Sequence, residues 1–270
     1  MENFSWLNAF REMGRKVREE LDLLFEGTGA GTAVGRGAGG DMTLMLDKKA
    51  EDAIVGVLEK LYASGEQFTF ISEELGEKAF GDGVLVLADP IDGSNNAKYG
   101  IPFYSTALAM ATGRTLKDVS LGYVINHGNG DEFWAIKGQG AYKNGLRIKT
   151  SGSAEIGMLN FEASVPGHDL HAAMPLLVAS RKVRCLGTTA LDLACLASGA
   201  TDMVLVPAPS RSFDYAAGWL LVREAGGVVT GTDGSALDDT PLGLGRTTPF
   251  IGANGNALLS IALGILKGGA

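Results

Sequence analysis

The chain has 270 residues, a length that accommodates one large domain or two modest ones. Hydrophobic residues make up 46% of it and charged residues 20%, the balance of an ordinary globular protein with ample material for a core. The net charge of -8 argues against a general nucleic-acid-binding protein, because phosphate backbones are bound by basic surfaces.

The sequence also argues against export and membrane insertion. The N-terminus lacks the basic start and apolar run of a signal peptide, and the longest apolar stretch, 258–266, is too short for a membrane span. Cys185 and Cys195 do not form a CxxC pair, so we expect two reduced thiols. Together these features predict a cytoplasmic protein with no membrane partner.

Two helices followed by strands are expected in the first half of the chain. Apolar residues recur at helical spacing over 4–25 and 47–62. Between these helices, 27–40 is dominated by glycine and is expected to be a mobile loop. A short strand is predicted over 68–72. The continuous apolar run 84–88 is typical of a strand buried on both faces.

The pattern of the remaining elements changes near residue 150, without a sharp boundary. Turn signals separate four expected strands, at 105–112, 119–126, 132–137 and 141–142. The second half is expected to hold a strand at 203–206 and helices at 189–198, 214–225 and 256–267. We therefore expect an α+β half, 1–150, and an α/β half, 151–270, which together form one compact unit and complete one site.

The segment Asp89-Pro90-Ile91-Asp92-Gly93-Ser94 is the most informative one. An apolar strand delivers two carboxylates into one tight turn, where they repel each other unless a cation lies between them. Oxygen ligands, including the Ile91 carbonyl, select Mg²⁺, Mn²⁺ or Ca²⁺ over zinc. The backbone N–H groups of Gly93 and Ser94 would then bind a phosphate. The alternative is a capped turn in which Asp92 is a helix N-cap.

Two other segments place acids at the ends of expected elements. Glu73 and Glu74 follow the strand 68–72, and adjacent glutamates usually mark a solvated surface. A second acidic strand end nearby favours one shared site instead. Asp214 opens a helix, where it is either a plain N-cap or a site residue, and that helix N-terminus would attract a phosphate in both cases.

In chain order the three motifs are Glu73-Glu74, the segment 89–94, and Asp214 at the start of a helix. Together they resemble the inositol monophosphatase and fructose-1,6-bisphosphatase superfamily of lithium-sensitive, Mg²⁺-dependent phosphatases. The likeness runs from about Asp47 to Gly227. Segments 101–103 and 138–145 resemble the archaeal branch, which hydrolyses both fructose bisphosphate and inositol phosphate. The resemblance implies a layered αβαβα sandwich of the sugar phosphatase type and a homodimer.

The resemblance also implies a role for each matching residue. Two or three Mg²⁺ ions, which Mn²⁺ can replace, would be bound by Glu73, Asp89, the carbonyl of Ile91, Asp92 and Asp214. Asp47 would work with Ser94 to orient the attacking water, and Glu73 would share in catalysis. The substrate would be bound by Asp92, Gly93, Ser94, Arg184, Thr188, Thr189 and Arg211.

One position departs from the archaeal pattern. That branch often has an Arg seven residues before the last metal-binding Asp, where this chain has Pro207. Arg211 lies nearby and is the candidate to compensate for this loss. The departure bears on the recognition of a second phosphate.

The sequence thus predicts an enzyme of carbohydrate metabolism that hydrolyses a phosphomonoester of a small polyol or sugar. The substrate would be inositol 1-phosphate, fructose 1,6-bisphosphate or both, attacked by metal-activated water. A 3′(2′),5′-bisphosphate nucleotidase and a non-catalytic metal- and phosphate-binding regulator of the same fold are the alternatives. The GxGxxG pattern at 35–40 follows a helix rather than a strand, which argues against dinucleotide binding.

Overall fold

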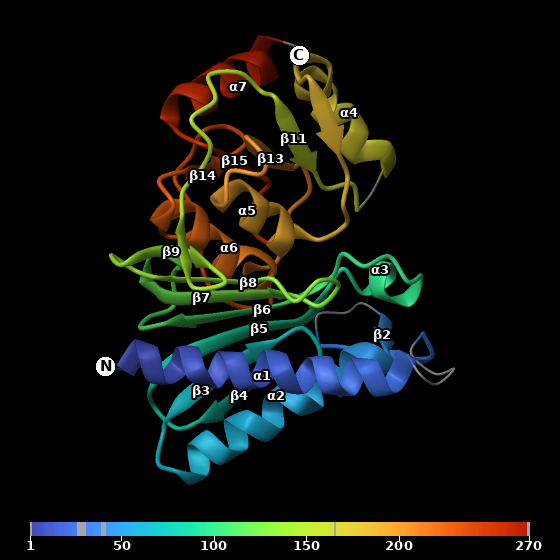
Figure 1. Ribbon diagram of the computed structural model, residues 1–270, viewed down its shortest axis with the longest axis vertical. Coiled ribbons are helices and arrows are strands. Elements are labelled where there is room, and N and C mark those ends of the chain that lie inside the picture. The colour runs from blue at the N-terminus through green and yellow to red at the C-terminus, as the bar shows by residue number, and fades with distance from the viewer. Residues whose placement is uncertain (1, 26–30, 39–41, 165, 269–270) are drawn as a thin grey trace.

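The protein, seen here as a computed structural model that describes residues 2–25, 31–38, 42–164 and 166–268, is built of five stacked layers. Two β-sheets alternate with three layers of helices (Figure 1). The helical layers hold α1 (Glu2–Phe25) with α2 (Met45–Ala63), α5 (Thr189–Ala197) with α6 (Ser212–Glu224), and α4 (Pro166–Ala179) with α7 (Asn256–Gly268). This arrangement confirms the expected αβαβα sandwich.

The larger sheet has eight strands in the order β10-β9-β8-β7-β6-β5-β3-β4. They are β3 (Phe68–Ser72), β4 (Gly76–Phe80), β5 (Val84–Asp92), β6 (Ser105–Ala111), β7 (Val119–Asn126), β8 (Glu132–Ile136), β9 (Gly140–Lys143) and β10 (Leu146–Ile148). β3 and β5 are parallel neighbours, and the other pairs are antiparallel. The carboxyl ends of β3 and β5 therefore lie at the same edge of the sheet.

Strand β5 shows why a continuous apolar run marks a central strand. Its residues alternate between two cores, with Val86 and Ala88 facing α1 and α2, and Leu85 and Leu87 facing α5 and α6. All four side chains are buried. Burial on both faces fixes the register of β5, because a slip by one residue would exchange the two faces. The strand therefore delivers the segment that follows it to a fixed place.

The smaller sheet has five strands in the order β12-β11-β13-β15-β14. They are β11 (Met158–Phe161), β12 (Lys182–Arg184), β13 (Met203–Val206), β14 (Val228–Gly231) and β15 (Phe250–Ala253). One face packs on α4 and α7, and the other faces α5 and α6. The middle helical layer thus joins the two sheets. No helix in the described part of the chain is long and apolar enough to cross a membrane.

The structure corrects the expectation for the glycine-rich segment 27–40. Within it, β1 (Ala33–Arg36) pairs antiparallel with β2 (Met42–Leu44), so pairing with a partner strand outweighs the weakening effect of glycine. Residues 26–30 and 39–41 lie outside the described residues. His168 lies in α4 with an exposed side chain that contacts Asp169.

Candidate active site

A cavity of about 750 Å³ opens where the carboxyl ends of β3 and β5 meet the middle helical layer. Its walls come from the residue after β3, the end of β5 and the turn that follows it, the segment after β11 and the start of α5. The segment 208–211, the first turn of α6 and Arg246 complete them. Five acids line it, which are Glu73, Asp89, Asp92, Glu162 and Asp214. Three of these were expected from the acidic strand ends, and one from the helix start.

The end of β5 and the turn that follows it are held in place by their neighbours. The pairing of β5 with β6 shifts register between Asp89 and Asp92, an irregularity that re-aims these side chains. The hydroxyl of Thr106 donates to the Pro90 carbonyl at 2.7 Å and contacts Nε2 of His127 at 2.8 Å. Gly93 follows with a φ of 89°, a conformation that favours glycine.

Asp92 is tied to the beginning of α5. Its Oδ2 accepts hydrogen bonds from the Thr188 hydroxyl and from the Ala190 amide, the latter at 2.7 Å. The residue that precedes the short helix α3 (Ser94–Lys98) is Gly93, so Asp92 is not the N-cap of that helix. The carboxylate instead joins the two halves of the chain at the cavity.

Asp214 and Asp47 occupy equivalent local positions. Each is the third residue of its helix, α6 or α2. Asp214 Oδ2 accepts from the amide of Arg211, and Asp47 Oδ2 accepts from the amide of Leu44, both at 2.9 Å. Asp214 is therefore not a plain N-cap, and its carboxyl group lines the cavity. Asp47 lies outside the lining.

Burial dominates the electrostatics of these acids. It raises the pKa of Asp92 to about 7 and that of Asp214 to about 8. The pKa of Asp89 is also raised, first by burial and then by the charges of Asp92 and Glu73. Asp89 Oδ1 is buried and has no hydrogen-bond partner among the described residues. A cation among these carboxylates would stabilise their charged forms.

The donor set fits a hard divalent cation, since it consists of carboxylate and carbonyl oxygens around an orphaned Asp89 oxygen. As placed, however, no three Asp, Glu, His or Cys side chains of the described residues are grouped closely enough to hold an ion. Glu73 Oε1 instead contacts the Arg211 guanidinium at 3.1 Å. The full ligand set would therefore need side-chain rotation.

A comparison with protein families decides what kind of site this is. Residues 5–261 match the model of the inositol monophosphatase family. The chain belongs to this family. It is therefore a phosphomonoester hydrolase, as the order of the acidic motifs indicated, and the family resemblance is confirmed.

Individual members of the family are similar over most of their length. The fructose-1,6-bisphosphatase/inositol-1-monophosphatase of Methanothermobacter thermautotrophicus is 36% identical over 247 residues, 87% of each chain. The protein of the same description from Archaeoglobus fulgidus is 36% identical over 82% of each chain. A solved structure from Pyrococcus horikoshii, described as similar to inositol-1 monophosphatase, superposes with a TM-score of 0.83 at 29% identity, over 97% of this chain and 98% of that one.

Within this family site, most residues expected to bind substrate line the cavity. Gly93, Ser94, Thr189 and Arg211 do so, as does Ile91 among the expected metal ligands. Two do not, and the roles of all these residues stay predictions. The two are Thr188, which is buried and bonds to Asp92, and Arg184, which is exposed and donates to its neighbour's carbonyl at 2.8 Å.

Several lining residues were not indicated by the sequence, among them Asn96, Glu162 and Arg246. Asn96 donates to the carbonyls of Phe103 and Leu186 at 2.8 Å and 2.6 Å, and so joins the α3 turn to the segment before α5. Glu162 follows β11, a strand that the sequence did not indicate. Arg246 lies in a glycine-rich connection with no motif of its own. If strand β11 had been predicted from the sequence, Glu162 would have stood out as an acid at a strand end. The sequence held no comparable signal for the other two.

Proposed function

We propose that this chain is a Mg²⁺-dependent phosphatase that hydrolyses inositol 1-phosphate, fructose 1,6-bisphosphate or both. The observation that carries the proposal is the meeting of three acids with raised pKa values, the buried Asp89 and the half-buried Asp92 and Asp214, in one cavity with the Gly93-Ser94 turn. The names of the Methanothermobacter and Archaeoglobus relatives support these two substrates.

Glu73, Asp89, the Ile91 carbonyl, Asp92 and Asp214 would hold the ions, two or three in number, and Mn²⁺ would replace Mg²⁺. When bound, these ions neutralise phosphate charge and lower the pKa of a water molecule. Around them, the amides of Gly93 and Ser94 bind the phosphate.

Proton handling falls to Asp47, together with the Ser94 hydroxyl, which orient the attacking water. The pKa of Asp47 is raised to about 7, chiefly by burial and further by the charges of Glu74 and Glu73. A pKa near the working pH suits a group that accepts or donates a proton. Glu73 shares in the same step.

The preference between substrates within this proposal depends on which basic side chains can contact a second phosphate. A single-phosphate polyol needs only the Gly93-Ser94 turn and the metals, whereas a bisphosphate needs a further cationic contact. Since Pro207 replaces an Arg that the archaeal branch often carries, we propose that inositol monophosphate is the better substrate. We also propose a cytoplasmic homodimer.

The test is phosphate release from a substrate panel with Mg²⁺, with Mn²⁺, and after chelation. We expect turnover of inositol 1-phosphate with either ion and none in excess EDTA, because the carboxylates need a cation to bind a phosphate. Turnover that persists in EDTA would refute metal dependence. Preferential release from adenosine 3′,5′-bisphosphate would favour the nucleotidase alternative, and no release from any substrate would favour the regulator.

A further inference from the structure

The cavity is lined by a basic side chain, that of Arg246, which the sequence motifs did not indicate. Besides its five acids, the described lining includes two basic side chains, Arg211 and Arg246. Arg246 comes from the long connection between β14 and β15, away from the motifs that supply the acids. Its position needs an explanation, because an exposed arginine in a glycine-rich segment could point anywhere.

Backbone and hydroxyl contacts place Arg246 beside Arg211. The two residues pair in an antiparallel bridge. The next residue, Thr247, donates to the Ser210 carbonyl through its amide at 2.8 Å and through its hydroxyl at 3.0 Å. The Thr247 hydroxyl also contacts the Tyr215 hydroxyl at 2.8 Å. Arg246 is therefore fixed to the segment that begins α6.

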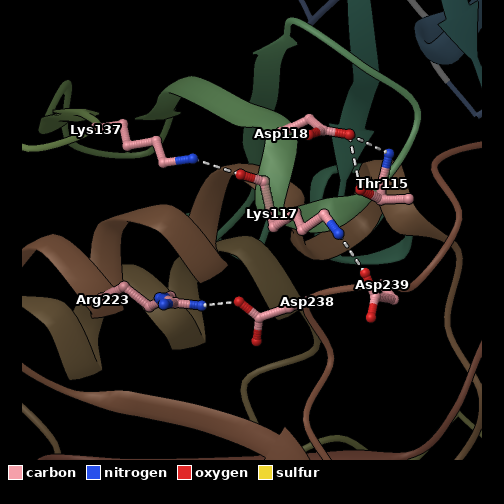
Figure 2. Close-up of polar contacts among 7 residues, drawn as sticks. All are labelled: Thr115, Lys117, Asp118, Lys137, Arg223, Asp238 and Asp239. Atoms are coloured by element: carbon pink, nitrogen blue, oxygen red, sulfur yellow. Dashed lines mark hydrogen bonds and ion pairs between the residues drawn. The ribbon is translucent and has the colours of Figure 1, made fainter.

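The earlier part of the same connection is fixed at a second place (Figure 2). Asp238 contacts Arg223 of α6 at 2.8 Å, and Asp239 contacts Lys117 at 2.5 Å. The amide of Leu116 donates to the Thr240 carbonyl at 2.9 Å. Exposed ion pairs add little individually, but with the backbone bonds they hold the connection at a second place besides Thr247. Arg246 is thus presented by an anchored segment.

The two arginines have different surroundings. Arg211 has a side chain only 7% exposed, and its guanidinium contacts Glu73 at 3.1 Å, among the expected metal ligands. Arg246 is exposed, and its Nη1 donates to the Pro209 carbonyl at 3.2 Å. A positive charge on the cavity wall, carried by a segment that supplies none of the five acids, suits a group that extends beyond the scissile phosphate.

We propose that Arg246 binds the second phosphate of a bisphosphate substrate and so raises kcat/KM for bisphosphates, without reversing the preference for inositol monophosphate. The inference rests on the proposed phosphatase function. A guanidinium binds phosphate oxygens through two parallel hydrogen bonds, which a lysine cannot match. Arg246 would supply the contact that Pro207 cannot, because the Pro209 carbonyl that holds Arg246 belongs to the same segment after β13.

Two substrates that differ only in the second phosphate isolate this contact. We would measure kcat/KM for fructose 1,6-bisphosphate and fructose 1-phosphate in wild type, Arg246→Gln and Arg246→Lys. Arg246→Gln should lower the bisphosphate value by about 10-fold to 100-fold, as expected for one charge-assisted contact, with most of the change in KM. The monophosphate value should change by less than about 3-fold. Arg246→Lys should fall in between.

Arg181→Gln is the matched control, since Arg181 is an exposed arginine outside the cavity that pairs with Glu155. It should leave both values unchanged, and thermal unfolding should show that every variant is folded. Equal loss for both substrates, or no loss for either, would overturn the inference. Inositol 1-phosphate as a third substrate distinguishes failure of the proposed role of Arg246 from failure of the proposed phosphatase function. Its turnover without any fructose ester turnover overturns the role of Arg246, whereas no turnover at all overturns the proposed function.

Discussion

Asp92 illustrates how one side chain serves both fold and site. Its carboxylate accepts from the Thr188 hydroxyl and the Ala190 amide, and it also lines the cavity with Asp89. Those hydrogen bonds favour the charged form and lower the pKa, but burial has the larger effect and raises it to about 7. The residue is held in place before any ligand arrives, which suits a group that must bind a metal with defined geometry.

Replacing the acid by its amide tests this role. Asp92→Asn and Asp214→Asn each keep an oxygen for the backbone hydrogen bond but lose the charge. We expect kcat to fall by about 100-fold or more in each variant, while thermal unfolding stays cooperative. Asp52→Asn is the control, because Asp52 is exposed and pairs with Lys48 outside the cavity. Near wild-type kcat in either site variant would mean that the metal site is misplaced.

The raised pKa values also predict how stability depends on pH. In metal-free protein, Asp92 and Asp214 bind protons more tightly when folded than when unfolded. Their contribution to stability is present at low pH and is lost as pH rises through about 7 and about 8. Burial lowers the pKa of His127 to about 3, so this residue is neutral in both states above about pH 7 and does not oppose the trend.

We therefore expect the urea midpoint of metal-free protein to fall between about pH 7 and 8.5. Asp214→Asn should show a shallower fall, since it lacks one of the titrating groups. Added Mg²⁺ should raise the midpoint more at the higher pH, because metal and protons compete for the same carboxylates. A midpoint that rises with pH in this window without metal would contradict the assignment of these buried acids.

Among the elements, the turn between β5 and α3 depends on one glycine. Gly93 has a φ of 89°, and a Cβ there would lie 3.1 Å from the Gly187 carbonyl oxygen and 3.3 Å from that of Phe103. Gly93→Ala should cost at least about 1–2 kcal/mol of unfolding free energy and lower kcat/KM by distorting the phosphate-binding turn. Urea unfolding and kinetics on the same preparation would measure both.

Gly56→Ala is the corresponding control. Gly56 lies inside α2, where a Cβ would meet nothing within 4 Å, and so alanine should stabilise the helix by about 0.5–1 kcal/mol. If Gly93→Ala were as harmless as Gly56→Ala, the close approach of the turn to the segment before α5 would not matter for the site.

The elements that sequence reasoning identified are those with strong periodicity or continuous burial. The helices over 4–25 and 47–62 and the strands over 68–72 and 84–88 are confirmed within a few residues. β14 and β15 were missed because each has four residues and a glycine, too little for a periodic signal. α4 was missed because Pro175 interrupts its pattern.

The same limit applies to the site. Glu73, Asp89, Asp92 and Asp214 could be found because they follow or open recognisable elements, and the structure brings all four into one cavity. Arg246 could not be found, since its position depends on the contacts that its neighbour Thr247 makes with Ser210 and Tyr215, more than 30 residues away in sequence. Long-range contacts of this kind leave no local trace.

At the scale of the whole molecule, the cavity draws on both halves of the chain. Glu73, Asp89 and Asp92 come from 1–150, while Asp214 and Arg246 come from 151–270. The core between the sheets is shared in the same way, because Leu87 of β5 packs in one cluster with Leu193 of α5 and Leu220 of α6. Separation at residue 150 would expose one whole face of the larger sheet.

This shared core predicts the behaviour of the isolated halves. Residues 1–150 expressed alone should show no sharp thermal unfolding transition, because buried leucines such as Leu85 and Leu87 would face water at about 1.5–3 kcal/mol each. Co-expression with 151–270 should restore a single cooperative transition and Mg²⁺-dependent phosphatase activity. The measurement is calorimetry of each half, of the co-expressed pair and of the intact chain. A stable 1–150 fragment with its own transition would show that the halves are independent domains, and the cavity would then be an interface between them.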